Sequence, residues 1–246
     1  MIQREEPPHG DASAVPRPIL RSAVLFIDFF LIIMALYHLK PASRSLILES
    51  HGASALPYIW IGSALVLLIA ITLYQHIVSR YRRFSIVLGT CAFFVMLLLL
   101  FWFALQTPGE IAPIGFYIFV DLFGVVLVEQ FWSLTDSIYT TEEGRRWYGL
   151  VGTGGLVGGA AGGGAAALII NYTPLQTADL LLVAAGILVV IVALTWFMGR
   201  LHIYEEDAEL APKAHPASGW RALTHSRYLL LIAAALLFAQ LVSPLV

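Results

Sequence analysis

Four acidic residues interrupt long apolar runs of the sequence. Asp28 lies in the first run, and Asp121, Glu129 and Asp136 lie in the fourth. An acid at membrane depth is costly, and by default it is a candidate functional group. Burial in a low-dielectric medium favours the neutral form of a carboxyl group, so binding and release of a proton is the chemistry to expect of such residues if they have a function.

The three acids of the fourth run share one side of a helix. Glu129 is eight residues after Asp121 and Asp136 is fifteen after it, so at about 100° per residue all three fall within an arc of about 80°. Such a stripe should face a cavity or another helix. For Asp28, Asp121 and Glu129, a proton-pathway role and a structural interhelical hydrogen bond both stay open. Asp136 better fits an interfacial acid paired with an arginine.

Two cations, Lys40 and Arg44, follow the first apolar run and are four residues apart. This spacing puts them on one helix face or in one turn, at the mouth of the first helix. Either their long side chains extend from the helix end to the membrane surface, or they attract anions to the entrance of a pathway. Together with Asp28, Asp121 and Glu129 they form the predicted pathway for substrate and protons.

The composition explains why these charges matter. The chain is 59% hydrophobic and only 12% charged, whereas soluble domains carry about 25% charged residues. Seven runs are long enough for the roughly 20 residues of helix that a bilayer core needs: 19–38, 56–78, 84–106, 113–137, 149–170, 178–198 and 228–246. The sequence therefore predicts an all-α, polytopic helical membrane protein.

The runs also predict the domain organisation. We expect a disordered leader over 1–18, a six-helix transmembrane bundle over 19–198, a linker over 199–227 and a seventh helix over 228–246. The seventh run has no polar residue beyond it, which predicts that the chain is the first part of a longer protein.

The cations predict the orientation of these helices in the membrane. Twelve of the fourteen Lys and Arg residues fall in segments that would share one side, and only Lys40 and Arg44 fall on the other. Positive residues favour the cytoplasm, so the amino terminus and the linker are expected to be cytoplasmic.

The fifth run, "GLVGTGGLVGGAAGGGAAALI", is rich in glycine. A phosphate-binding loop would need a preceding strand and either the G-x-G-x-x-G register or a nearby Gly-Lys-Ser/Thr, and all of these are missing. Two rows of glycines recur four apart, which is the spacing of a close-packed helix face in lipid. The expected packing residues are Gly154, Gly155, Gly158, Gly159, Gly162 and Gly163.

Other kinds of chemistry are not indicated. The sequence has no nucleophile–base pair, and His38, His51 and His76 have no partner at metal-ligand spacing. We therefore predict no enzyme activity, no cofactor, no metal and no nucleic-acid partner.

A family resemblance adds to this reading. The six helices, the basic loop "SRYRRF" after the second and the long linker resemble the first half of a major facilitator superfamily transporter. The segments "YHLKPASRSLILESHGASALPYIW", "FWSLTDSIYTTEEGRRWYGLVGTGG" and "GWRALTHSRYLLLIA" resemble the ATP/ADP antiporter branch and its bacterial relatives. Within these segments the chain departs from the nucleotide exchangers, which have an acid in place of Pro41 and an asparagine in place of Asp136.

The resemblance implies a secondary transporter in a bacterial inner membrane, working by alternating access. The partners would be lipid, a small-molecule solute such as an organic anion or nucleotide, and a missing carboxyl-terminal half. It also implies a cytoplasmic gate, made of Arg80, Arg83, Asp136, Arg145 and Arg146. A non-transporting membrane anchor or sensor, and an inactive fragment of a longer transporter, remain the alternatives.

Overall fold

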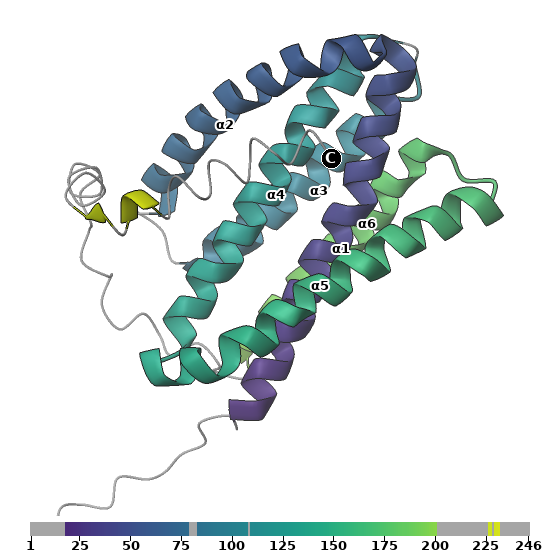
Figure 1. The fold of residues 1–246 in the computed structure, drawn as a ribbon. Coiled ribbons are helices and arrows are strands. Elements are labelled where there is room, and N and C mark those ends of the chain that lie inside the picture. Colours follow the sequence, from purple (N-terminus) through teal and green to yellow (C-terminus); the bar gives the residue numbers. More distant parts are fainter. Residues whose placement is uncertain (1–17, 79–82, 108, 201–225, 228, 232–246) are drawn as a thin grey trace, which may run out of the picture. The chain divides into compact units, whose positions relative to one another are not determined.

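The computed structural model describes residues 18–78, 83–107, 109–200, 226–227 and 229–231 (Figure 1). The helices are α1 (Pro18–His51), α2 (Leu56–Val78), α3 (Arg83–Ala104), α4 (Ile111–Ile138), α5 (Thr141–Tyr172) and α6 (Leu180–Arg200), with short 3-10 turns at Ala53–Ala55 and Thr177–Asp179. Among the described residues, six helices are long and apolar enough to cross a membrane. This confirms the predicted all-α, multi-pass fold.

The chain divides into two compact units, Met1–Glu206 and Asp207–Val246. In the second unit, residues 227 and 229–231 are helical. The rest of the predicted seventh helix, 228–246, and nearly all of the predicted linker, 199–227, lie outside the described residues, as does the leader up to residue 17. The fold described below is that of the first unit.

The first helix is longer than the sequence predicted. Residues after 38 were expected to leave the helix, but α1 continues through Pro41 to His51 and has 34 residues. Serine side chains bond to carbonyl groups of the same helix, as in Ser50 Oγ to Leu46 O at 2.7 Å, so these polar residues do not interrupt it. Gly52, with a φ of 72°, ends the helix, because this conformation suits glycine.

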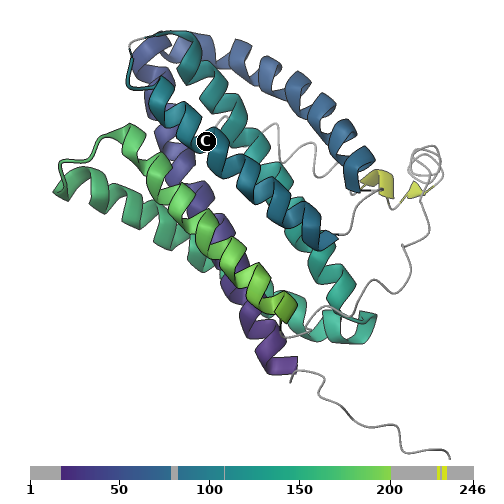
Figure 2. The same cartoon turned by 180° about the vertical axis from the view of Figure 1, so that it is seen from behind.

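Helix α1 occupies the centre of the unit. It packs most extensively against α5, and then against α6 and α4. Figure 1 shows α5 crossing α1 along much of its length, and Figure 2 shows α3 and α6 on the opposite face, where they pack on each other. Any charge carried by α1 therefore lies close to several other helices.

The glycines of α5 allow this close contact. A Cβ atom added at Gly154 would lie 2.5 Å from the carbonyl oxygen of Phe26, and one at Gly162 would lie 2.6 Å from that of Met34. A Cβ atom at Gly158 would overlap the carbonyl group of Phe30 in the same way. The backbones of the two helices thus meet without intervening side chains, as in small-residue packing within lipid. The structure also places Gly155, Gly159 and Gly163 against side chains of α1.

Stacked aromatic rings fill much of the core between α1, α3 and α4. Phe29 stacks on Phe131 with ring centroids 4.5 Å apart, and Phe94 stacks on Phe123 at 5.4 Å. By contrast, α2 leaves most of its apolar side chains exposed, including Leu65, Leu68, Ile69 and Leu73. In a bilayer such a surface faces lipid, so its exposure carries no penalty.

Candidate functional site

Three charged residues lie near one another between α1, α2 and α4, without forming an ion pair. Lys40 and Arg44 are one turn apart on α1, and both act electrostatically on the carboxyl group of Asp121 in α4. Ser63 of α2 lies beside the same carboxyl group, although its hydroxyl makes no hydrogen bond of standard geometry. Lys40 and Asp121 are half-buried and Arg44 is exposed. We refer to Lys40, Arg44 and Asp121 as the charged cluster.

Neighbouring side chains hold the three helices together at this point. The indole Nε1 of Trp60 in α2 donates a hydrogen bond of 2.9 Å to the Tyr117 hydroxyl of α4. Beneath this bond, Ile47, Ile59 and Tyr117 form a small buried cluster with one member from each helix. The charged cluster therefore sits on a packed support, which limits the motion of its side chains relative to one another.

The sequence predicted the three charges but not their neighbours. Tyr117 and Asp121 are four residues apart, and Trp60 and Ser63 are three apart, which places each pair on one helix face. Polar groups at these spacings inside apolar runs are the signal that could have identified them. Which helices these residues would join depends on tertiary packing, and the spacing of residues along one helix gives no information about that.

Asp28 lies apart from the charged cluster, in the core of the unit. Its side chain is 3% exposed and lines a small cavity with residues of α3, α4 and α6. Sequence analysis placed Asp28, Asp121 and Glu129 on one pathway, but the structure gives them three environments. Asp121 is half-buried in the charged cluster, while Glu129 is exposed on α4, about 12 Å further along the helix axis.

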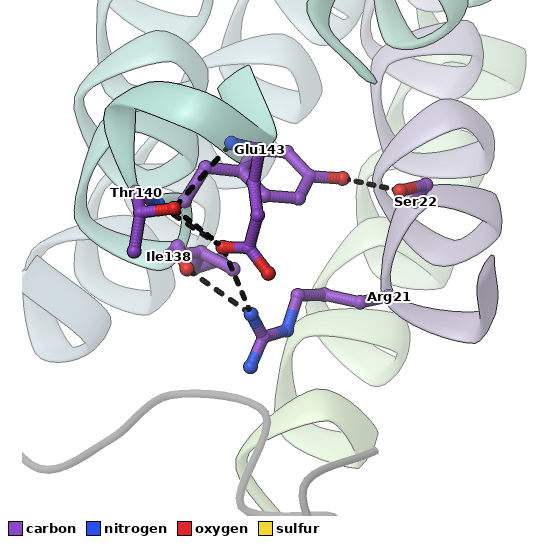
Figure 3. Close-up of polar contacts among 6 residues, drawn as sticks. Arg21, Ser22, Ile138, Thr140 and Glu143 are labelled. Carbon is purple, nitrogen blue, oxygen red and sulfur yellow. Dashed lines mark hydrogen bonds and ion pairs between the residues drawn. The ribbon is translucent and has the colours of Figure 1, made fainter. Parts of the chain in front are cut away.

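A polar contact joins the beginning of α1 to the turn between α4 and α5 (Figure 3). Arg21 Nη1 donates to the carbonyl oxygen of Ile138 at 3.2 Å and lies 4.0 Å from Glu143 Oε2. Ser22 Oγ and the Tyr139 hydroxyl are 2.6 Å apart. Burial raises the pKa of the Tyr139 phenol above its ordinary value, so this hydroxyl stays neutral at physiological pH.

Glu143 has a second role in the same contact, because it caps α5. Thr140 Oγ1 accepts a hydrogen bond from the Glu143 backbone at 3.4 Å, and the Thr140 backbone N–H donates to Glu143 Oε2 at 3.1 Å. This is a capping box, for which Thr-x-x-Glu is the sequence signature. It explains why α5 begins at Thr141, within a segment that the sequence analysis treated as a loop.

The described residues of the predicted cytoplasmic gate lie in several local environments, and the gate stays a prediction. Asp136 is exposed and accepts a hydrogen bond of 2.8 Å from the Tyr148 hydroxyl. Arg146 lies over the ring of Trp147 at 5.7 Å, and Arg145 is exposed. Arg83 begins α3, and Arg80 lies outside the described residues. Arg21 and Glu143 make a charged contact between the start of α1 and the start of α5, which the sequence analysis did not predict.

Replacing Glu143 should loosen this end of the bundle. Glu143→Ala removes the side-chain half of the capping box and the ion-pair partner of Arg21, while the Thr140 hydroxyl still caps α5, so we expect the free energy of unfolding to fall by about 1 kcal/mol. Chemical unfolding in detergent micelles measures this change. Glu142→Ala is the matched control, because it removes the same charge from the same first turn while leaving the cap and Arg21 intact. Equal losses in the two variants would contradict the assigned contacts.

The fold and these sites define a multi-pass helical membrane protein with charged residues held between its helices. Comparison with protein families assigns it further. The family model described as TLC ATP/ADP transporter matches residues 113–246, which is more than half of the chain. The chain therefore belongs to the TLC ATP/ADP transporter family, a family of nucleotide transporters. No match was found among curated proteins or among solved structures.

The match covers α4, α5, α6 and the residues after them. It confirms the predicted likeness to the ATP/ADP antiporter branch, and it agrees with the expectation that the protein is a transporter. Asp121 lies inside the matched region, whereas Lys40 and Arg44 lie before it. The case for these two cations therefore rests on their proximity to Asp121.

Proposed function

We propose that this chain is one half of a secondary transporter of the major facilitator type, which exchanges nucleotides or related organic anions by alternating access with proton coupling. Family membership supports the class of substrate. The charged cluster supports its location, because Lys40 and Arg44 both lie near one carboxyl group between three helices. The proximity of Lys40 and Arg44 to Asp121 is the observation on which the proposal mainly rests.

Electrostatics explains what the charged cluster would do. Two cations and one acid leave a net positive charge at the site. The surrounding apolar helices have a low dielectric constant, which strengthens the electrostatic attraction of an anion to this charge. Asp121 would hold Lys40 and Arg44 in place when no substrate is bound, and phosphate oxygens would replace it as their partner. A nucleotide carries more charge than these two cations neutralise. In this proposal, residues of the second half supply the remainder.

The proposal includes an orientation of the protein in the membrane. We place the amino terminus in the cytoplasm of a bacterial cell, because twelve of the fourteen Lys and Arg residues belong to segments that share its side. Lys40 and Arg44 then lie toward the outer face, where they meet an incoming anion first. The contact of Arg21 with the α4–α5 turn would lie at the inner face, and the halves would rock about a site between the two levels.

Transport into proteoliposomes tests this function. The protein, expressed from its full-length gene, should take up labelled ATP when the vesicles contain ADP, and take up little when they are empty. An imposed pH gradient should change the rate of exchange if protons are coupled. Absence of uptake with either ADP or another nucleotide inside would contradict exchange, and uptake that is insensitive to the pH gradient would contradict coupling.

A further inference from the structure

A small cavity lies in the core of the six-helix unit, away from the charged cluster. It has a volume of about 10 Å³ and is lined by side chains from α1, α3, α4 and α6. Its walls are apolar except at Asp28, Cys91 and Gln130. A cavity of this size has room for about one water molecule. It is too small for any organic solute, so its polar groups need another explanation.

Two oxygen atoms at this cavity have no hydrogen-bond partner. They are Asp28 Oδ1 on α1 and Gln130 Oε1 on α4, in side chains that are 3% and 4% exposed. The other end of the Gln130 amide is used, because Nε2 donates a hydrogen bond of 2.7 Å to Thr90 Oγ1 of α3. A buried acceptor without a donor costs about 1–3 kcal/mol. The cavity thus contains two acceptors and lacks a strong donor, because the thiol of Cys91 is a weak donor and bonds to neither oxygen.

The charged and titratable residues around the cavity indicate which group provides the missing hydrogen-bond donor. Cys91 of α3 is the other titratable residue in its lining, and the lining residues of α4 and α6 carry no charge. The nearest cation along α1, Arg21, is about 10 Å away along the helix axis and is bonded to the Ile138 carbonyl. An unpaired carboxylate in such a place would cost several kcal/mol. A proton on Asp28 removes that charge and provides the missing donor.

A metal ion fits the cavity less well than a proton. Cations that prefer oxygen need about six ligands, whereas the lining offers the carboxyl group of Asp28 and the amide oxygen of Gln130 among apolar side chains. One water molecule, by contrast, can accept a hydrogen bond from the acid and donate one to Gln130 Oε1. This arrangement satisfies both orphaned oxygens with the space available.

We propose that Asp28 and Gln130 form the internal proton-binding site of the transporter, separate from the cluster that receives the substrate. Asp28 carries the proton, and Gln130, held by Thr90, receives the hydrogen bond through one water. The site joins α1 to α3 and α4, so a change in the packing of α1 would change the stability of the bound proton. The inference deepens the proposed function, because it rests on proton-coupled exchange.

Infrared spectroscopy of the full-length protein in lipid tests the site without measuring transport. At neutral pH, the protein should show the C=O stretching band of a protonated carboxylic acid in an apolar environment. Asp28→Asn should remove this band. Gln130→Leu should shift it to higher frequency, because the water loses its second partner, leaves the cavity and no longer accepts a hydrogen bond from the acid. Glu49→Gln is the matched control, since Glu49 is an exposed acid on the same helix, and it should leave the band unchanged.

The outcomes separate this inference from the proposed function. A spectrum without the band, or a band that survives Asp28→Asn, overturns the proton site even if the protein exchanges nucleotides. Loss of the band when NaCl replaces choline chloride also overturns it, because a metal ion would then be the occupant. If Asp28→Asn fails to fold, Gln130→Leu and the sodium comparison still decide. In transport, Asp28→Asn should abolish the effect of a pH gradient, and a retained effect overturns the coupling role.

Discussion

Gly158→Ala should separate α1 from α5 and lower the free energy of unfolding by about 3 kcal/mol. The added methyl group would meet the carbonyl oxygen, carbonyl carbon and Cα of Phe30, which are backbone atoms that cannot rotate away. The two helices would have to move apart along their longest shared contact. Thermal unfolding in detergent micelles, or resistance to sodium dodecyl sulfate, measures the loss.

The same helix provides matched controls for this prediction. Gly152 and Gly164 have no atom within 4 Å of an added Cβ. Gly152→Ala and Gly164→Ala should therefore be neutral or stabilise the protein by up to about 1 kcal/mol, because alanine favours a helix more than glycine does. Gly163→Ala should have a small effect, since its nearest neighbour would be Tyr37 Cδ1 at 3.9 Å. Similar losses for Gly152, Gly158 and Gly164 would contradict the packing described for α5.

Lys40→Gln should raise the nucleotide concentration for half-maximal exchange by about 10- to 100-fold. A hydrogen bond to a charged group contributes about 1.5–3 kcal/mol, and each 1.4 kcal/mol corresponds to a factor of about ten. Lys40→Arg keeps the positive charge and should retain most of the affinity. Concentration-dependent uptake of labelled ATP into ADP-loaded proteoliposomes measures the effect.

A second cation serves as the control for Lys40. Arg200 lies at the end of α6, where its guanidinium group stacks over Trp196 at 4.5 Å. Arg200→Gln removes one positive charge from the protein without touching the charged cluster, so the half-saturating concentration should stay within about twofold, as expected for screened distant charges. An unchanged value for Lys40→Gln, or an equal rise for Arg200→Gln, would contradict the assigned role of the cluster.

Much of the fold follows from the sequence because lipid imposes simple rules. Long apolar runs predicted all six helices of the first unit, and the four-residue glycine period predicted a close-packed face on α5. The ends of helices were harder to predict. Pro41 and the serines after it looked like a loop, yet α1 continues because their side chains bond within the helix. The capping box of Thr140 and Glu143 has a known sequence motif, but the charged residues around it were interpreted as a loop and the motif was not predicted.

The candidate sites were less predictable, because they depend on contacts between helices. Helical periodicity placed Asp121, Glu129 and Asp136 on one side of α4, but it could not predict which residues of other helices would lie near them. The structure places Asp121 near two cations, bonds Asp136 to Tyr148 and leaves Glu129 exposed. Arg21 was counted only as a positive charge that sets orientation. Its contact with Ile138 joins residues 117 positions apart, a separation at which local patterns carry no information.

The most direct test of the substrate pathway uses a single cysteine at the exposed end of the charged cluster. Cys91 is the chain's one cysteine and is buried, so Arg44→Cys in a Cys91→Ala background provides one reactive thiol. We predict that excess ATP or ADP slows modification of this thiol by a cationic thiosulfonate, whereas adenosine, which lacks phosphate, does not. If the thiol reacts at the same rate with and without ATP, nucleotide does not pass the cluster.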